Sequence, residues 1–268
     1  QARRVEGDIL PSAQAQQRLL VLKQPIGVTA AITPWNFPAA MIARKIAPAL
    51  AAGCSMLIKP AEQTPLSAYA LEVLATQAGL PADVMITLSG DAVAVGKTLC
   101  ESDVVRKLSF TGSTEVGRIL MQQCAPTIKK LSLELGGNAP VIVFDDANIE
   151  QAVKGIMASK FRNSGQTCVC ANRVYIQAGV YAAVSQRVIE EVNKLKTGDG
   201  RVDGVTQGPL IDEEAIAKVQ AHIQDAVSKG AKVQAGGQRV AADNTFFEPT
   251  VLTDVTQAMR VAREETFG

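Results

Sequence analysis

Short apolar runs alternate with longer helical patterns along most of the chain, and this alternation limits the folds open to it. Residues 26–33 predict a buried strand, and residues 38–53 predict a helix that ends at Gly53. Strand–helix repetition of this kind is typical of an α/β protein whose parallel sheet carries helices on both faces. Further strands are expected at residues 55–59, 84–88, 104–110, 140–144, 173–177 and 246–252, and further helices at residues 65–79, 91–100, 113–124, 149–161, 180–196 and 212–230.

A glycine pair at residues 136–137 separates a first set of strands and helices from a second set. We therefore expect two domains, residues 1–136 and residues 137–268. Residues 7–25 do not follow the alternation, and the run 18–24 within them reads as an isolated strand. Because an unpaired strand edge favours pairing with another chain, contact between subunits is expected there.

The composition argues against several classes of function. A formal net charge of +1 gives no electrostatic footprint for nucleic acid or an anionic membrane, and no apolar run is long enough to span a membrane. One histidine, His222, and five cysteines without C-x-x-C spacing argue against a zinc site and a histidine-based triad. Scattered cysteines, and an N-terminus without the apolar core of a signal peptide, favour reduced thiols and a cytoplasmic location.

The strongest candidate for chemistry is Cys168, which ends the sequence FRNSGQTC at residues 161–168. A small, polar, glycine-containing turn can leave a thiol accessible, with backbone N–H groups near it. Such N–H groups lower the pKa of a thiol and can hold an oxyanion. The alternative is a buried structural cysteine, which behaves as a small hydrophobic residue.

Two further motifs place one polar side chain in a constrained setting. Glu134 stands between leucines in LELGG (133–137), and burial there would raise the pKa of its carboxyl group toward that of a general base. Asn36 lies between two prolines in TPWNFP (33–38), so its amide is rigidly aimed and could donate to an oxyanion. The alternatives are a solvent-facing glutamate at a strand edge and an ordinary turn asparagine.

Two motifs suggest a nucleotide. KPAEQTP (59–65) puts Lys59 and Glu62 at the end of an expected strand, where open parallel sheets bind ligands. SFTGSTEVG (109–117) reads as a strand, a Gly-Ser-Thr turn and a helix, and the first amides of that helix could bind a phosphate. Alone, this second motif is weak evidence because it lacks the G-x-G-x-x-G pattern.

In this order and spacing, these motifs and REETFG (263–268) resemble the aldehyde dehydrogenase superfamily along the whole chain. TPWNFPAAMIARK and KFRNSGQTCVCANR are most similar to the succinate-semialdehyde dehydrogenases. The resemblance implies the aldehyde dehydrogenase fold, with a Rossmann-like cofactor domain over residues 1–136 and an α/β catalytic thiol domain over residues 137–268. It also implies oxidation of an aldehyde to an acid with NAD or NADP.

The resemblance assigns roles to individual residues. Cys168 matches the nucleophile, Asn36 the side-chain oxyanion donor and Glu134 the general base. The positions that match cofactor contacts are Thr33, Pro34, Trp35, Lys59, Glu62, Gly112, Ser113, Gly117, Leu135, Gly136, Glu265 and Phe267.

Several finer expectations follow from the same resemblance. Arg44 and Arg162 are expected to hold the distal carboxylate of succinic semialdehyde, and Cys170 to form a reversible disulfide with Cys168. A carboxylate at Glu62 favours NAD over NADP. Residues 7–25 match part of the oligomerisation region, so a homo-oligomer, dimer or tetramer, is expected.

Family subunits extend before Gln1 and beyond Gly268, so the chain is expected to be incomplete at both ends and a poor enzyme alone. The alternatives are a cofactor-free cysteine hydrolase, a CoA-acylating enzyme, a non-acylating dehydrogenase of another aldehyde, and a truncated relative that only binds nucleotide or partners. His222 is expected on the surface, and Asp145–Asp146 are expected to cap the helix that follows. Cys54, Cys100 and Cys124 are expected to be core residues.

Overall fold

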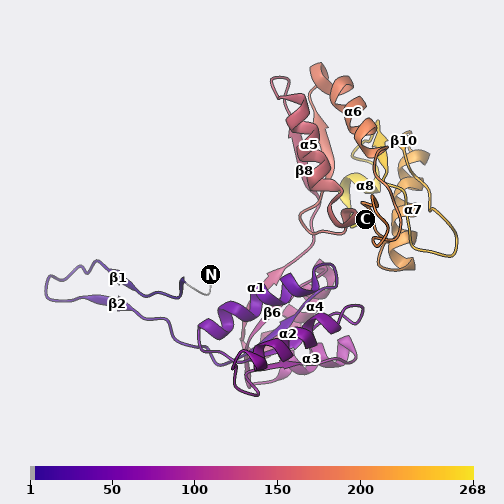
Figure 1. The fold of residues 1–268 in the computed structure, drawn as a ribbon. Helices are drawn as coiled ribbons and strands as arrows, with labels where there is room; N and C mark the ends of the chain where they lie inside the picture. Colours follow the sequence, from indigo (N-terminus) through magenta and orange to yellow (C-terminus); the bar gives the residue numbers. More distant parts are fainter. Residues whose placement is uncertain (1–3) are drawn as a thin grey trace. The chain divides into compact units, whose positions relative to one another are not determined.

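The computed structural model describes residues 4–268, so residues 1–3 of the first expected domain lie outside the described part of the chain (Figure 1). The chain divides into two compact units, Gln1–Leu135 (unit 1) and Gly136–Gly268 (unit 2). The division falls one residue away from the boundary expected from the sequence. Each unit has strands and apolar clusters of its own.

A five-stranded sheet forms the centre of unit 1. Its strands lie in the order β5-β4-β3-β6-β7, and every neighbouring pair is parallel. The chain therefore builds first to one side of β3 and then to the other. The bounds are β3 (Val28–Ile32), β4 (Met56–Lys59), β5 (Met85–Thr87), β6 (Val105–Thr111) and β7 (Lys130–Glu134).

Four helices connect these strands and cover both faces of the sheet (Figure 1). On one face, Ile42 shares an apolar cluster with Ala31 of the central strand; on the other, Leu99 shares a second cluster with Ala30. Successive side chains of a strand point to opposite faces, so β3 contributes to both clusters. This arrangement confirms the predicted α/β fold. The helices are α1 (Pro38–Ala51), α2 (Leu66–Gln77), α3 (Ala92–Glu101) and α4 (Thr114–Cys124).

Local sequence explains where these helices begin and end. Asp91 caps α3 by accepting a hydrogen bond from Ala94 N at 2.7 Å, and Ser113 caps α4 by accepting one from Val116 N at 3.2 Å. Gly53 follows α1 with a φ of +79°, a left-handed conformation that glycine adopts without a steric penalty.

Residues 7–25 form an antiparallel hairpin rather than the single strand expected at 18–24, because β1 (Asp8–Leu10) pairs with β2 (Leu19–Val21). Its apolar side chains are exposed: Ile9 at 76% and Leu20 at 65%. A two-stranded hairpin with exposed apolar side chains has little stability of its own and offers an apolar surface for a partner.

Unit 2 contains two small sheets packed with helices. The strands β8 (Ala139–Val143) and β9 (Ala171–Ile176) are parallel, whereas β10 (Lys232–Ala235) and β11 (Val251–Thr253) are antiparallel. A buried cluster of valines and isoleucines, including Val153 and Val184, joins α5 and α6 to this unit's strands. The helices are α5 (Ile149–Lys160), α6 (Ala178–Val192), α7 (Glu213–Ser228) and the one-turn α8 (Arg260–Arg263).

Two expectations for unit 2 are wrong. The cap of α5 is Asn148, which accepts from Gln151 N at 3.0 Å, and not Asp145–Asp146. The strand expected at residues 246–252 is only Val251–Thr253, since Pro249 has no N–H to give to a ladder.

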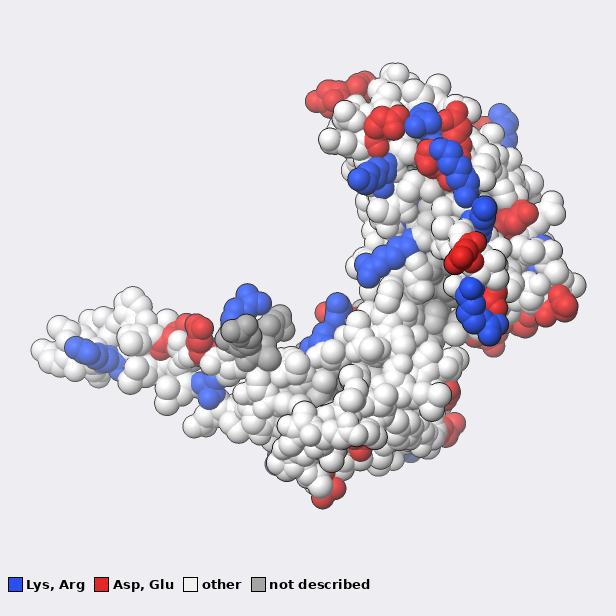
Figure 2. Space-filling view, in the orientation of Figure 1, with Lys and Arg blue, Asp and Glu red and all other residues white. Residues whose placement is uncertain are grey.

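Charges of both signs are interspersed on the face of unit 2 that Figure 2 shows, whereas much of the face of unit 1 in that view is uncharged. No helix within residues 4–268 combines the length and the apolar character of a membrane-spanning candidate.

Candidate active site

The carboxyl ends of four strands meet at one edge of the unit 1 sheet. Ile32 of β3 is aligned with Lys59 of β4 on one side and Phe110 of β6 on the other, and Thr111 is aligned with Glu134 of β7. Thr33 N donates to the Lys59 carbonyl at 3.1 Å and extends the ladder past the strand ends. Because the strand order reverses at β3, this edge is the position where open α/β sheets bind ligands.

A buried lysine and an exposed carboxylate are paired at this edge. The Lys59 side chain is 4% exposed, and its ammonium donates to the Glu62 carboxylate and, at 3.1 Å, to the Pro60 carbonyl. Partial burial opposes ionisation of Glu62, but the hydrogen bond from Lys59 holds the pKa of the carboxyl group below its ordinary value. Glu62 therefore presents a fixed, ionised acceptor to a ligand such as a ribose hydroxyl.

Glycines bring backbone close to the start of α4. A Cβ at Gly112 would collide with the Phe110 ring, and a Cβ at Gly117 would lie 2.6 Å from Leu135 Cδ2. The hydroxyls of Thr33 and Thr111 at the strand ends are buried and have no hydrogen-bond partner within residues 4–268. Close backbone, helix amides and orphaned hydroxyls together fit a phosphorylated ligand such as a dinucleotide.

Asn36 and Glu134 occupy different local settings in unit 1. Asn36 is half-buried in the loop between β3 and α1, and the Phe37 carbonyl that follows accepts from Met41 N at 2.9 Å to start the helix. Glu134 is exposed, because strand alternation buries Leu133 and Leu135 partly and turns the glutamate outward. The burial predicted for Glu134 is therefore wrong for this chain.

Lys45 is a charged residue of this region that the sequence reading missed. It is 7% exposed on α1, and its ammonium donates to Ser109 Oγ at 3.0 Å. Burial lowers the pKa of Lys45 to about 8; the Glu134 carboxylate opposes this lowering, while Arg44 and Lys107 add to it. The available signal was helical periodicity, since position 45 falls on the apolar face of α1.

The Cys168 motif forms a tight turn in unit 2. Asn163, Ser164 and Gly165 all have positive φ, at +52°, +54° and +77°. The turn is held by the loop that follows Gln207: Ser164 Oγ donates to Gly208 O at 3.0 Å, and Gln166 Nε2 donates to Pro209 O at 3.2 Å. Such a strained backbone persists only where its surroundings fix it.

The two cysteines after this turn differ in access. All five cysteines are free thiols; Cys168 is half-buried, whereas Cys170 is 2% exposed and donates to the Lys160 carbonyl at 3.4 Å. Burial raises the pKa of the Cys170 thiol, and the neighbouring Lys160 ammonium opposes this. Within residues 4–268 no carbonyl accepts the Cys168 N–H, which fits the backbone oxyanion donor expected there.

The last residues of the chain contact both glycine motifs of unit 2. A Cβ at Gly136 would collide with the Glu265 carboxylate, and one at Gly165 would lie 2.7 Å from the Gly268 carbonyl oxygen. Lys160 Nζ donates to the same carbonyl at 2.7 Å. Unit 2 thus gathers Gly136, the Cys168 turn and the segment that contains Glu265.

The two arginines that are expected to hold the substrate carboxylate are both accessible. Arg44 is exposed on α1 of unit 1, and Arg162 is exposed at the start of the Cys168 turn of unit 2. Unit 2 also contains a cavity of about 560 Å³, but Cys168 does not line it, so we do not assign the aldehyde to it. No group of three His, Cys, Asp or Glu side chains within residues 4–268 is arranged to hold a metal ion.

Replacing Lys45 with Met should change how stability depends on pH. The pKa of Lys45 is about 8 in the folded protein, below the ordinary 10.5 of the unfolded chain. Between pH 8 and pH 10.5, the folded protein has therefore released a proton that the unfolded chain still binds. The free energy of unfolding of the wild type, relative to Lys45→Met, should therefore rise from pH 8 to pH 10.5 by up to roughly 3 kcal/mol. Urea unfolding across this range measures it.

The matched control is Lys97→Met, because the Lys97 side chain is 60% exposed on α3. It should show no comparable slope. If the difference in the free energy of unfolding between wild type and Lys45→Met did not change with pH, this would contradict the lowering of the Lys45 pKa by burial.

Comparison with known proteins gives one family and close relatives. The model of the aldehyde dehydrogenase family matches residues 1–268. The chain is 61% identical over 268 residues to a succinate-semialdehyde dehydrogenase [NADP(+)] of Escherichia coli and covers 56% of it. It is 60% identical to a 3-sulfolactaldehyde dehydrogenase of Pseudomonas putida and covers 55% of that protein.

A solved structure agrees with the fold. The crystal structure of a succinate-semialdehyde dehydrogenase from Burkholderia pseudomallei matches the whole chain with a TM-score of 0.96 and 58% identity, and the match covers 55% of that structure's chain. The chain thus spans about half the length of the curated relatives it matches.

Proposed function

The chain belongs to the aldehyde dehydrogenase family, and we propose that the full-length protein oxidises an aldehyde to a carboxylic acid with NAD or NADP. The observation that carries this proposal is the Cys168 turn, where a half-buried thiol follows a strained backbone and its close neighbour, Cys170, is buried. Only an accessible thiol can reach a carbonyl carbon.

The proposed chemistry uses three side chains in sequence. The Cys168 thiolate attacks the aldehyde carbonyl, and the Asn36 amide with the Cys168 N–H donates to the resulting oxyanion. The bound nucleotide supplies the hydride acceptor. The product is a thioester on Cys168, and Glu134 removes a proton from the water that hydrolyses it. The Glu134 side chain is exposed, so water can reach its carboxylate.

The first test is a pair of variants in the full-length protein. Cys168→Ala should lower turnover of an aldehyde by about a thousandfold or more while nucleotide binding persists. Glu134→Gln should slow the steady rate more than the first burst of reduced nucleotide, because the base acts after hydride transfer. Cys54→Ala, a buried cysteine distant in sequence, is the control. Normal turnover by Cys168→Ala would refute the assignment of the nucleophile.

We propose that the nucleotide binds along the carboxyl edge of the unit 1 sheet. The resemblance matches Lys59 and Glu62 to the adenosine ribose and Ser113 to the pyrophosphate. Two observations support this proposal: Lys59 is paired with Glu62, and Gly112 and Gly117 let the chain pack closely around the start of α4. In unit 2, Glu265 and Phe267 are matched to the nicotinamide end.

Glu62 should favour NAD over NADP, although two relatives, at 61% and 57% identity, carry NADP(+) in their names. The carboxylate accepts from a 2′-hydroxyl but repels a 2′-phosphate by about 1 kcal/mol or more. Glu62→Ser should raise kcat/KM for NADP relative to NAD roughly five- to tenfold, with the exposed neighbour changed in Gln63→Ser as control. A wild type that already prefers NADP would refute the proposed role of Glu62.

The substrate we propose is succinic semialdehyde. The two relatives described above are named for aldehydes that carry a second, anionic group, a carboxylate in one and a sulfonate in the other. Arg44 and Arg162 are exposed, and guanidinium forks suit bidentate anions such as a carboxylate.

Neutralising either arginine tests this specificity. Arg44→Met and Arg162→Met should each raise KM for succinic semialdehyde on the order of tenfold, and should leave KM for butanal nearly unchanged. Arg106→Met, at the amino end of β6 and thus at the opposite edge of the sheet, is the control. Equal efficiency of the wild type on both aldehydes would count against a carboxylate site.

Three alternatives remain distinguishable by assay. A cysteine hydrolase would show no nucleotide binding in a titration, and a CoA-acylating enzyme would need coenzyme A for turnover. A relative without catalysis would bind nucleotide but reduce none.

We also propose that the exposed hairpin β1–β2 contacts a second copy of the chain. Leu20→Asp should weaken this contact, and an analysis of oligomeric state would measure the change.

We retain the Cys168–Cys170 disulfide as a proposal for oxidising conditions. Burial disfavours the Cys170 thiolate, so the more accessible Cys168 would be oxidised first, and Cys170 would then attack the oxidised sulfur to form the disulfide. Peroxide inactivation that dithiothreitol reverses equally well in Cys170→Ala would exclude the pair.

A further inference from the structure

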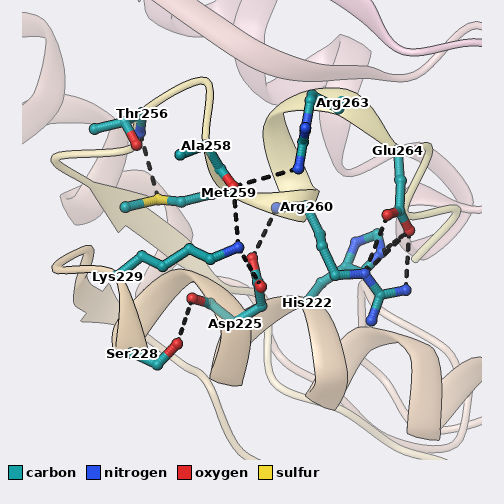
Figure 3. A network of polar contacts seen from close by, with 10 residues as sticks. All are labelled: His222, Asp225, Ser228, Lys229, Thr256, Ala258, Met259, Arg260, Arg263 and Glu264. Atoms are coloured by element: carbon teal, nitrogen blue, oxygen red, sulfur yellow. Dashed lines mark hydrogen bonds and ion pairs between the residues drawn. The ribbon is translucent and has the colours of Figure 1, made fainter.

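The only histidine of the chain is buried, which corrects the surface position expected from the sequence. His222 is 1% exposed in the middle of α7. Burying a polar ring is costly unless both nitrogens find partners. Here both do: Nδ1 lies 3.1 Å from Thr266 Oγ1, and Nε2 lies 3.3 Å from Glu264 Oε2 (Figure 3 shows the second contact).

These two partners stand on either side of Glu265. The ring therefore contacts both sequence neighbours of Glu265, the residue that the proposed function matches to the nicotinamide ribose. The Glu265 carboxylate in turn lies against Gly136, where any Cβ would collide with it. The contacts of both flanking residues help to fix the backbone at Glu265, and Gly136 leaves room for its carboxylate.

The protonation state of the ring fits both partners. A carboxylate is only an acceptor, so Nε2 must carry the hydrogen that is donated to Glu264. Nδ1 is then an acceptor, and the Thr266 hydroxyl donates to it. Burial lowers the pKa of His222, the nearby Arg260 and Lys218 lower it further, and Glu264 opposes both; the ring is thus neutral at pH 7.

The same face of α7 also contacts Ala258 and Arg260, which precede Glu264 in the sequence. Asp225 accepts from Arg260 N at 2.7 Å and from Lys229 Nζ at 2.6 Å, and Lys229 also donates to the Ala258 carbonyl at 2.9 Å. Arg260 closes the network by donating to the Glu264 carboxylate at 2.9 Å (Figure 3). His222, Asp225 and Lys229 recur at three- and four-residue spacing, so one helix face fixes residues 258–266 as a unit.

We propose that His222 is a positioning residue that fixes Glu265 for the nicotinamide end of the dinucleotide. The inference rests on the proposed function, because it requires that the segment from Glu264 to Phe267 contacts the nucleotide. The His222 ring contacts Thr266 and Glu264, which flank Glu265, so its effect should appear in nucleotide affinity more than in the reactivity of the nucleophile.

The test compares NAD affinity with the reactivity of Cys168 in the full-length protein. His222→Ala should raise the Kd for NAD on the order of tenfold. The rate at which iodoacetamide alkylates Cys168 in the absence of nucleotide should stay within about twofold of wild type. Thr266→Val removes a single hydroxyl contact, and His222→Gln keeps one donor and one acceptor; both should raise the Kd less than His222→Ala. Gln220→Ala, exposed on the same helix, should change neither quantity.

The outcomes distinguish failure of the proposed function from failure of the positioning role of His222. Failure of the wild type to bind NAD would overturn the proposed function and this inference together. Normal NAD affinity in folded His222→Ala and Thr266→Val variants, or a parallel change of NAD affinity and alkylation rate, would overturn the positioning role alone.

Discussion

The register of the parallel sheet is the constraint on which the candidate binding edge of unit 1 depends. β3 is paired on both sides, and its last residue, Ile32, is level with Lys59 and Phe110. Motifs that are far apart in the sequence therefore emerge at one edge. A slip by one residue would turn every side chain of a strand to the other face. Ala30 and Ala31 belong to separate apolar clusters, so the core fixes the register, and the register fixes the edge.

Unit 2 concentrates conformational strain where the thiol is presented. Two non-glycine residues in succession, Asn163 and Ser164, have left-handed backbone, at a cost of roughly 1–3 kcal/mol each. Gln166 is buried and bridges to the next loop: its amide donates to Pro209 O, and its Oε1 accepts from Ile211 N at 3.0 Å. These contacts offset the strain and leave Cys168 more accessible than Cys170, which the same turn buries.

Patterns that depend on neighbours in sequence were predictable, and contacts made at long range were not. Helix starts at Pro38 and strand ends at Lys59 follow from local propensity and apolar periodicity. The cap of α5 was misplaced because Asp145 and Asn148 have similar capping chemistry, and only the backbone conformation at Asn148 decides between them. Glu134 was expected to be buried because of its leucine neighbours, but alternation in a strand implies the opposite.

Lys45 and His222 were missed for a related physical reason. Each lies on the buried face of a helix, and each has hydrogen-bond partners 42 to 64 residues away in sequence: Ser109 for Lys45, and Thr266 and Glu264 for His222. A leucine of similar volume would generally stabilise such a site as well or better, since ionisable groups are costly to bury. Packing alone therefore does not account for either residue. What each adds over leucine is a directed contact: Lys45 joins α1 to β6 beside Glu134, and His222 joins α7 to both neighbours of Glu265. The fold thus gives up stability at two points of its core to hold residues beside the candidate site, which is where departures from apolar packing are expected in a functional protein.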